Sequence, residues 1–314
     1  MDLAHGGHLT HGHPLNYSGR TFRCIGYGVD RETERIDYDQ VERLAREHRP
    51  KLIIGGASAY SRIVDYARLR QIADDVGARL MADVAHVAGL IAAGVHPNPM
   101  SHVDVMTTTT HKTLRGPRGA LILCGEAIAK EIDAAVFPGI QGGPLMHAVA
   151  AKAVAFGEAM SEAFRRDQQR TLENAAALAG ALGAAGLRIV SGGTDTHLFL
   201  VDLRSRRLTG RAVEQRLEQL GMALNKNTIP FDPEKPMIGS GVRIGTPAVT
   251  TRGMGTVEMR QIASLLLEAL DGELDASRGA SIASRVRTLC EAFPIYPWIR
   301  PRAADRVAGV APAI

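Results

Sequence analysis

Long apolar runs and paired cysteines are both missing from this 314-residue sequence. No apolar run approaches the roughly 18 residues that span a bilayer, and the residues after Met1 do not form a basic stretch followed by an apolar one. Cys24, Cys124 and Cys290 lie far apart without a C-x-x-C pair, which disfavours a disulfide framework or a zinc site. We therefore expect a soluble, unexported protein of a reducing compartment, the cytoplasm.

A strong charge imbalance is also absent. Lys and Arg number 37 against 33 Asp and Glu, a net charge of +4, and the arginines are scattered. This pattern gives little support to nucleic-acid binding, and we expect neither a nucleic-acid nor a membrane partner. A hydrophobic content of 45% is that of a globular protein, and the length allows two domains.

Short apolar runs alternate with helix-like stretches in the first 130 residues. Such alternation predicts an α/β fold with a mostly parallel sheet covered by helices. Glycine pairs follow several of these runs, at strand ends where open α/β sheets bind ligands. Strands are expected at 21–27, 51–54, 79–84, 103–108 and 120–124, and helices at 41–48 and 66–76.

The pattern changes after about Leu145 to long alanine-rich helices that continue to Leu182. Further strands are expected at 187–190 and 197–203, and helices at 209–220, 256–270 and 281–292. We predict a large domain over 1–160, a smaller C-terminal α+β domain over 161–298 and a disordered tail over 299–314.

The strongest local feature is TTTTHKTLRGPRG at 107–119, a threonine run that stops at His111 and Lys112. A lysine forms imines well only when part of its population is neutral, which burial or neighbouring positive charge achieves by lowering its pKa. His111, Arg115 and Arg118 are candidate neighbours. The alternative is an ordinary surface lysine in a basic turn.

Asp83 ends an apolar run in LMADVAHVAGL at 80–90, with His86 three residues later. A carboxylate at a buried strand end needs a partner. A pyridinium nitrogen is one such partner, and protonation of that ring makes pyridoxal phosphate an electron sink. The alternative is that Asp83 caps the next helix.

Seven strings, in order, resemble the motifs of the serine hydroxymethyltransferase family and cover nearly the whole sequence from Asp2 to about Pro294. The resemblance implies a pyridoxal-phosphate enzyme of fold type I, with a large domain like that of aspartate aminotransferase. The strings are HGGHLTHG (5–12), IIGGASAYSR (53–62), MADVAHVAGL (81–90), TTTTHKTLRGPRG (107–119), FPGIQGGPLMH (137–147), SGGTDTHLFLVDL (191–203) and SGVRIGTPAVTTRG (240–253).

The resemblance assigns cofactor contacts residue by residue. It makes Lys112 the lysine that binds the cofactor covalently and Asp83 the partner of the pyridine nitrogen. It places His8 against the face of the ring, and Ser58 and His86 near the phenolic oxygen.

Other assignments concern the substrates. Thr109 and His111 flank the lysine, where the family tunes which substrate reacts, and Gly143 matches a backbone donor to phosphate across a dimer interface. Arg243 matches the residue that holds the substrate carboxylate through its planar guanidinium. Positions around the folate are matched by Leu3, Gly7, His8, Leu9, Asn227, Lys235, Pro236 and Met237.

Two features keep alternative readings. His5, His8, His11 and His13 could form a metal cluster, but they lack the fixed ligand spacing of a structural zinc site, and we predict no metal. Arg252 could orient the surroundings of Arg243 or cap a helix.

The activity implied is the reversible transfer of the serine hydroxymethyl group to tetrahydrofolate. Its products are glycine and 5,10-methylenetetrahydrofolate, which belongs to one-carbon metabolism and glycine biosynthesis. Serine, glycine and folate are the expected ligands, and a homodimer or homotetramer the expected assembly.

The sequence opens within a few residues into a glycine and histidine loop of the kind that follows a strand. The family carries a preceding segment with an acid/base glutamate, two active-site tyrosines, a serine-rich phosphate cradle and much of the dimer contact, and we expect this sequence to lack it. Two other hypotheses follow: a shortened chain that is inactive alone, or a related pyridoxal-phosphate aldolase such as a threonine aldolase.

Overall fold

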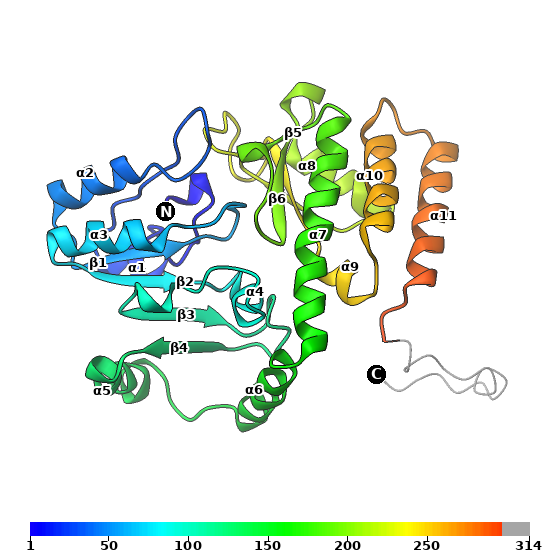
Figure 1. Ribbon diagram of the computed structural model, residues 1–314. Helices are drawn as coiled ribbons and strands as arrows, with labels where there is room; N and C mark the ends of the chain where they lie inside the picture. The colour runs from blue at the N-terminus through cyan, green and yellow to red at the C-terminus, as the bar shows by residue number, and fades with distance from the viewer. Residues whose placement is uncertain (297–314) are drawn as a thin grey trace.

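The computed structural model describes residues 1–296. The predicted tail at 299–314, like the predicted end of the second domain at 298, lies outside the described residues. The described chain forms two four-stranded sheets, and the long helix α7 (Glu162–Ala184) packs against the second of them (Figure 1).

The first sheet has the strand order β1-β2-β3-β4. The first three strands are parallel and β4 is antiparallel to β3, which confirms the predicted α/β fold with a mostly parallel sheet. The predicted strands after residue 50 are found to within two residues at each end. The strands are β1 (Leu52–Gly56), β2 (Arg79–Asp83), β3 (Val105–Thr109) and β4 (Ala120–Cys124).

Helix α3 (Tyr66–Val76) packs beside β1, and α2 (Tyr38–His48) packs beside α3 (Figure 1). The Asp65 side chain accepts a hydrogen bond from the Arg68 N–H at the start of α3, and Gly77 ends the helix in the left-handed conformation. Between these caps Leu69 and Ile72 are fully buried in the core under the sheet. Two further short helices are α1 (Tyr17–Thr21) and α4 (Ala88–Ala92).

The strand predicted at 21–27 is wrong. Thr21 ends α1, and the residues after it run extended without pairing along a neighbouring strand. Phe22 and Ile25 are 63% and 43% exposed, so little apolar surface covers this β-prone stretch before Tyr27. Intrinsic strand preference needs such a surface and a pairing partner to become a strand.

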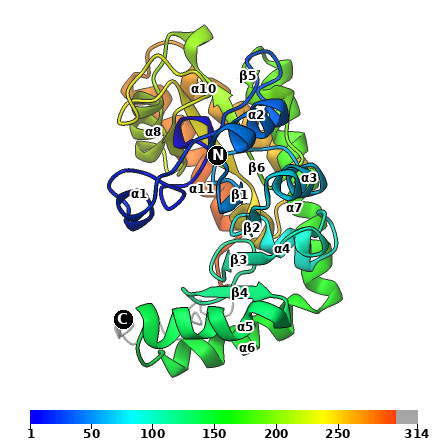
Figure 2. The same cartoon turned by 90° about the vertical axis from the view of Figure 1, so that its left-hand side faces the viewer.

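The edge strand β4 differs from its neighbours because none of its residues is buried. Beyond it lie α5 (Glu126–Ala134) and α6 (Met146–Ala159), joined through a kinked turn at Ala135–Ile140 (Figure 2). Most side chains of α5 and α6 are likewise exposed.

The second half of the chain folds around an antiparallel sheet with the order β5-β6-β8-β7. The strands and helices predicted here are present, and α11 begins five residues earlier than expected. The elements are β5 (Arg188–Ile189), β6 (Leu198–Asp202), α8 (Gly210–Gln219), β7 (Asn225–Asn227), β8 (Gly241–Gly245), α9 (Pro247–Thr251), α10 (Thr256–Leu270) and α11 (Ala276–Ala292).

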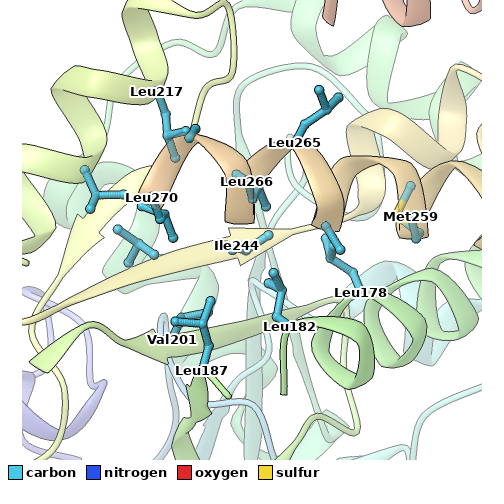
Figure 3. Close-up of a cluster of buried hydrophobic side chains, with 14 of the residues drawn as sticks. Leu178, Leu182, Leu187, Val201, Leu217, Ile244, Met259, Leu265, Leu266 and Leu270 are labelled. Atoms are coloured by element: carbon cyan, nitrogen blue, oxygen red, sulfur yellow. The ribbon is translucent and has the colours of Figure 1, made fainter. Parts of the chain in front are cut away.

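The main hydrophobic core lies in this second half (Figure 3). Leu182 of α7, Val201 of β6, Ile244 of β8 and Leu266 of α10 meet there, all buried. Each such side chain removed from water contributes about 1.5–3 kcal/mol. The core therefore holds α7, both central strands and α10 as one unit.

Within residues 1–296, no helix combines the length and the apolar character needed to cross a membrane.

Candidate active site

The carboxyl ends of the parallel strands meet at one edge of the first sheet, the position where α/β folds bind ligands. Gly56, Asp83 and Thr109 end β1, β2 and β3 there. Gly56 has φ +137°, and a Cβ at this position would lie 2.2 Å from the Asp83 carbonyl oxygen. Glycine is required because the two strand ends approach so closely.

The histidine loop at 5–13 folds over this edge. The carbonyl of Gly6 accepts hydrogen bonds from the Ser58 and Ala59 N–H groups at 2.9 and 3.0 Å, and the Ser58 hydroxyl donates to the Gly7 carbonyl at 2.7 Å. The loop is thereby attached to the segment that follows β1.

Asp83 is bound on both carboxylate oxygens. Oδ2 lies 2.8 Å from His11 Nε2, and Oδ1 accepts from the Ala85 N–H at 3.1 Å. Burial alone would raise the pKa of Asp83, but these hydrogen bonds, His11 first, hold the pKa below its ordinary value. The carboxyl is therefore ionised at neutral pH. The alternative that Asp83 caps the next helix is wrong, because the N-cap of α4 is Val87, which has no side-chain cap hydrogen bond, and Asp83 Oδ1 instead accepts from a residue that precedes the helix.

His11 is a residue that the sequence interpretation missed, because it appeared there only as a possible metal ligand. Its side chain is almost fully buried. The available signal was the need of a buried carboxylate for a donor, combined with a nearby loop that supplies four histidines. Which histidine serves depends on how the loop folds.

Lys112 lies half-buried in the turn after β3, and its Nζ donates to Thr109 Oγ1 at 3.2 Å. Burial lowers the pKa of Lys112, with Asp83 opposing and Arg243 and Arg118 reinforcing the shift. A larger part of its population is therefore neutral than for an exposed lysine, as an imine-forming amine requires.

The other expected neighbours of Lys112 behave differently. Arg115 points away to Asp167 of α7, with Nη1 3.1 Å from the carboxylate, so its selection as a neighbour was wrong. The backbone of Arg115 has φ +58°, and this conformation directs its side chain away from Lys112. The ring of His111 lies near the Gly119 N–H, with 3.5 Å between the two nitrogens.

Arg243 reaches the first sheet from β8 of the second. Its Nη1 donates to the Ser58 carbonyl at 2.8 Å, and within residues 1–296 it has no carboxylate partner. Burial lowers the pKa of its guanidinium, which nevertheless stays charged at neutral pH. A partly buried cation beside Lys112, without a carboxylate partner among the described residues, is suited to binding an anionic ligand.

Two histidine rings from opposite halves of the chain stack at this junction. The rings of His86 and His197 have centroids 5.8 Å apart and an interplanar angle of 17°. Burial, then His197, Lys112 and Arg243, lower the pKa of His86 to about 2. Burial and then Arg243 lower the pKa of His197 to about 3, so both rings are neutral at neutral pH.

His8 lies next to this group. Its ring is 5.7 Å from that of His11, and its Nδ1 is 2.7 Å from Thr10 Oγ1. Burial, and then the charges of His11 and Lys112, lower the pKa of His8. The structure therefore brings His8, Asp83, His86, Lys112 and Arg243 together.

The positions matched to folate fall on two neighbouring loops. One loop carries Leu3 to Leu9, and the other runs from Asn227 through Met237. Their contact is the ring of His5 against Phe231, with 4.7 Å between centroids.

Gly143 lies apart from these groups, in the exposed segment that precedes α6. A Cβ added there would have no atom of the described residues within 4 Å. Its surroundings within one chain therefore leave its backbone open to another molecule.

Arg252 is a helix cap. Its Nε and Nη2 donate to the carbonyls of Phe293 and Cys290 at 2.7 and 2.9 Å, at the end of α11. The helix-cap interpretation is confirmed, since these carbonyls lack partners inside the helix.

The histidine loop offers no metal centre. In the described part of the chain, no group of three or more His, Cys, Asp or Glu side chains is arranged to hold a metal ion.

Ion pairs hold the second sheet against the first. Arg62 pairs with Asp195 at 2.8 Å, and Arg188 forms two hydrogen bonds to Glu34 at 2.9 and 3.0 Å. Both pairs are partly buried, and the paired fork of Arg188 fixes an orientation as well as a distance. These ion pairs therefore hold the two halves of the chain together beside the candidate site.

Comparisons with known proteins agree with this geometry. The family model described as serine hydroxymethyltransferase matches residues 1–266. The sequence is 59% identical over 304 residues to a serine hydroxymethyltransferase of Rhodospirillum centenum (strain ATCC 51521 / SW), and the alignment covers 95% of this chain and 71% of that relative. With the lysine, aspartate and arginine of the family's motifs gathered at one sheet edge, the chain belongs to the serine hydroxymethyltransferase family.

Proposed function

We propose that this chain catalyses the pyridoxal-phosphate-dependent, reversible transfer of the serine hydroxymethyl group to tetrahydrofolate, giving glycine and 5,10-methylenetetrahydrofolate. The observation that carries the proposal is the convergence of Lys112, Asp83 and Arg243 at the carboxyl edge of the first sheet. A reactive amine, a partly buried carboxylate and a guanidinium without a carboxylate partner are the three groups that an amino-acid substrate and this cofactor need.

The described residues fit the cofactor. An ionised Asp83, held by His11, suits a protonated ring nitrogen, and Lys112 supplies an amine with a lowered pKa. His8 lies beside both and is the proposed stacking partner of the ring. Pyridoxal phosphate, when bound, supplies an electron sink for cleavage at the substrate α-carbon.

Lys112 and Thr109 act as a pair. The Thr109 hydroxyl oxygen accepts from Lys112 Nζ and so fixes the position of the amine. Because the pKa of Lys112 is lowered, its amine gives up a proton more readily, as the amine that would hold the cofactor covalently requires. His111 and Thr109 stay our candidates for selecting which substrate reacts.

Arg243 is proposed to hold the substrate carboxylate. One of its nitrogens is bound to the Ser58 carbonyl, which fixes the plane of the fork. A second N–H pair remains for two parallel hydrogen bonds to a carboxylate.

Folate is proposed to bind between the loop at 3–9 and the loop at 227–237, where Leu3, Gly7, Leu9, Asn227 and Lys235 to Met237 lie. The contact of His5 with Phe231 supports one binding surface across both loops.

We also propose, from the family resemblance, a homodimer or homotetramer that works in the cytoplasm. In that assembly the backbone of Gly143 donates to the phosphate bound by another copy, for which its open surroundings leave room. We also propose that the large and the small domain meet near residue 160.

The test is glycine formation from serine by the purified chain, with and without tetrahydrofolate. Glycine that depends on folate, and that falls by at least about 10³-fold in Lys112→Ala, supports the proposal. The control is Lys130→Ala, an exposed lysine on α5. Cleavage of 3-hydroxy amino acids without folate would favour the aldolase alternative, and no reaction by the folded chain would contradict the proposal.

A further inference from the structure

The stacked rings of His86 and His197 are carried by different halves of the chain. The His86 carbonyl accepts from Thr113 Oγ1 at 3.0 Å, and the same hydroxyl accepts from the Gly89 N–H at 2.9 Å. Thr113 directly follows Lys112, so the backbone of His86 is fixed by the turn that carries the lysine. This turn holds only the backbone of His86, and its ring is positioned by another part of the chain.

His197 is held by the second sheet. It immediately precedes β6, and its carbonyl accepts from the Thr246 N–H at 3.0 Å just beyond β8. Arg243 lies on β8, paired with Leu200 of β6. The ring that faces His86 and the guanidinium that reaches Ser58 therefore belong to one rigid pair of strands.

The groups around His86 make the position of its ring depend on the ring of His197. Lys112, Arg243 and His197 disfavour a charge on His86, and Asp83 favours one. His197 is only 6% exposed and its ring lies nearly parallel to that of His86, with 5.8 Å between centroids, so water reaches His86 less than it would beside a small residue. Loss of the His197 ring would expose His86 to water and allow the His86 ring to rotate.

We propose that His197 is a positioning residue: its ring, carried by the second sheet, fixes the plane of the His86 ring and shields one face of it from water. The two strands that present Arg243 to a carboxylate thus also set the orientation of His86. The expected position of His86 near the cofactor rests on the proposed function, whereas its stacking on His197 is a property of the chain without ligands.

The Nδ1 atom of His197 makes a matched control variant possible. Its Nδ1 is buried without a hydrogen-bond partner in residues 1–296, so His197→Phe keeps a flat ring and removes an unsatisfied polar atom. His197→Ala removes the ring, and His197→Leu fills the space without a flat surface. A role in stacking predicts that Phe differs from both Ala and Leu.

The first measurement is an NMR titration of the apoprotein with labelled histidine, in which His86→Gln identifies the His86 signal. We expect the signal to stay unprotonated down to about pH 5 in the natural chain and in His197→Phe. In His197→Ala and His197→Leu we expect its pKa to rise by about two to three units, because water reaches the ring, so that a measurable fraction of the ring is protonated at pH 5. This measurement requires no catalytic activity.

The second measurement separates kcat from KM for serine. We expect kcat to fall by about tenfold in His197→Ala while KM changes less than about threefold, and His197→Phe to recover most of the loss. An unchanged His86 titration in folded His197→Ala or His197→Leu would overturn the proposal, as would a His197→Phe variant as impaired as Ala. Absence of transferase activity in the natural chain counts against the proposed function alone, since the titration still decides the role of His197.

Discussion

The two ends of the molecule treat apolar surface differently. In the second half, all five residues of β6 are buried, and α7, α8 and α10 pack on the sheet that contains it (Figure 3). At β4, α5 and α6, no strand residue is buried and large apolar side chains face outward, Leu145 at 67% exposure among them. The second half completes its own core, whereas the β4 to α6 region presents the kind of exposed apolar surface that marks an interaction site.

The largest contrast is expected between leucines of the two regions. Leu266→Ala should lower the free energy of unfolding by about 2–5 kcal/mol, because the side chain is buried among α7, α10 and the central strands. Leu145→Ala, the matched exposed change, should cost less than about 0.5 kcal/mol in the monomer. Urea denaturation of both variants measures the difference. Equal losses would show that the β4 to α6 region is packed in solution.

The junction between the two sheets should be sensitive to acid. Burial lowers the pKa of His96 to about 4, of His197 to about 3 and of His86 to about 2. The unfolded chain takes up protons near pH 6.5 while the folded chain does not, so stability is complete above 6.5 and falls as the pH drops from 6.5 towards these values.

The acid slope has an upper limit of about 1.4 kcal/mol per pH unit for each such histidine. Urea titrations between pH 7.5 and 5 measure it, and His197→Phe should make the curve shallower. A stability that stays constant or rises on acidification would contradict the buried neutral histidines.

The third prediction concerns the support of Asp83. His11→Phe removes the donor to Asp83 Oδ2 and should raise the carboxyl pKa and weaken pyridoxal phosphate binding by about tenfold. Fluorescence titration with the cofactor measures the affinity, and His13→Phe is the control because it lies in the same loop. An unchanged affinity in His11→Phe would show that the hydrogen bond does not support cofactor binding.

The smallest effect on stability is expected at Val154 of α6, an exposed apolar residue. Val154→Asp should change monomer stability by less than about 0.5 kcal/mol. If the β4 to α6 region forms the contact between copies, the same change should shift sedimentation towards smaller species. Unaltered sedimentation of an oligomer would exclude Val154 from the contact.

Most elements were predictable because their periodicity and caps are local. The helix at 66–76 has an aspartate before it and a glycine after it, and its limits were predicted as observed. The antiparallel direction of β4 was not predicted, although only about ten residues separate β3 from β4, too few for a helical crossover to a parallel strand.

The composition of the site was predictable, but its internal contacts were not. Lys112, Asp83 and Arg243 could be selected from motifs, because their residue types match the chemistry at strand ends. The partners of these residues depend on loop geometry: φ +58° turns Arg115 to α7, and the fold of residues 5–13 selects His11. His197 contacts His86 only because two separate sheets meet.

The most direct test of the account is to treat the purified chain with pyridoxal phosphate and borohydride, digest it and locate the reduced adduct by mass spectrometry. We predict modification of the peptide that contains Lys112, at one equivalent per chain, and its loss in Lys112→Ala. Modification spread over exposed lysines such as Lys130, with Lys112 unmodified, would contradict the assignment of this site.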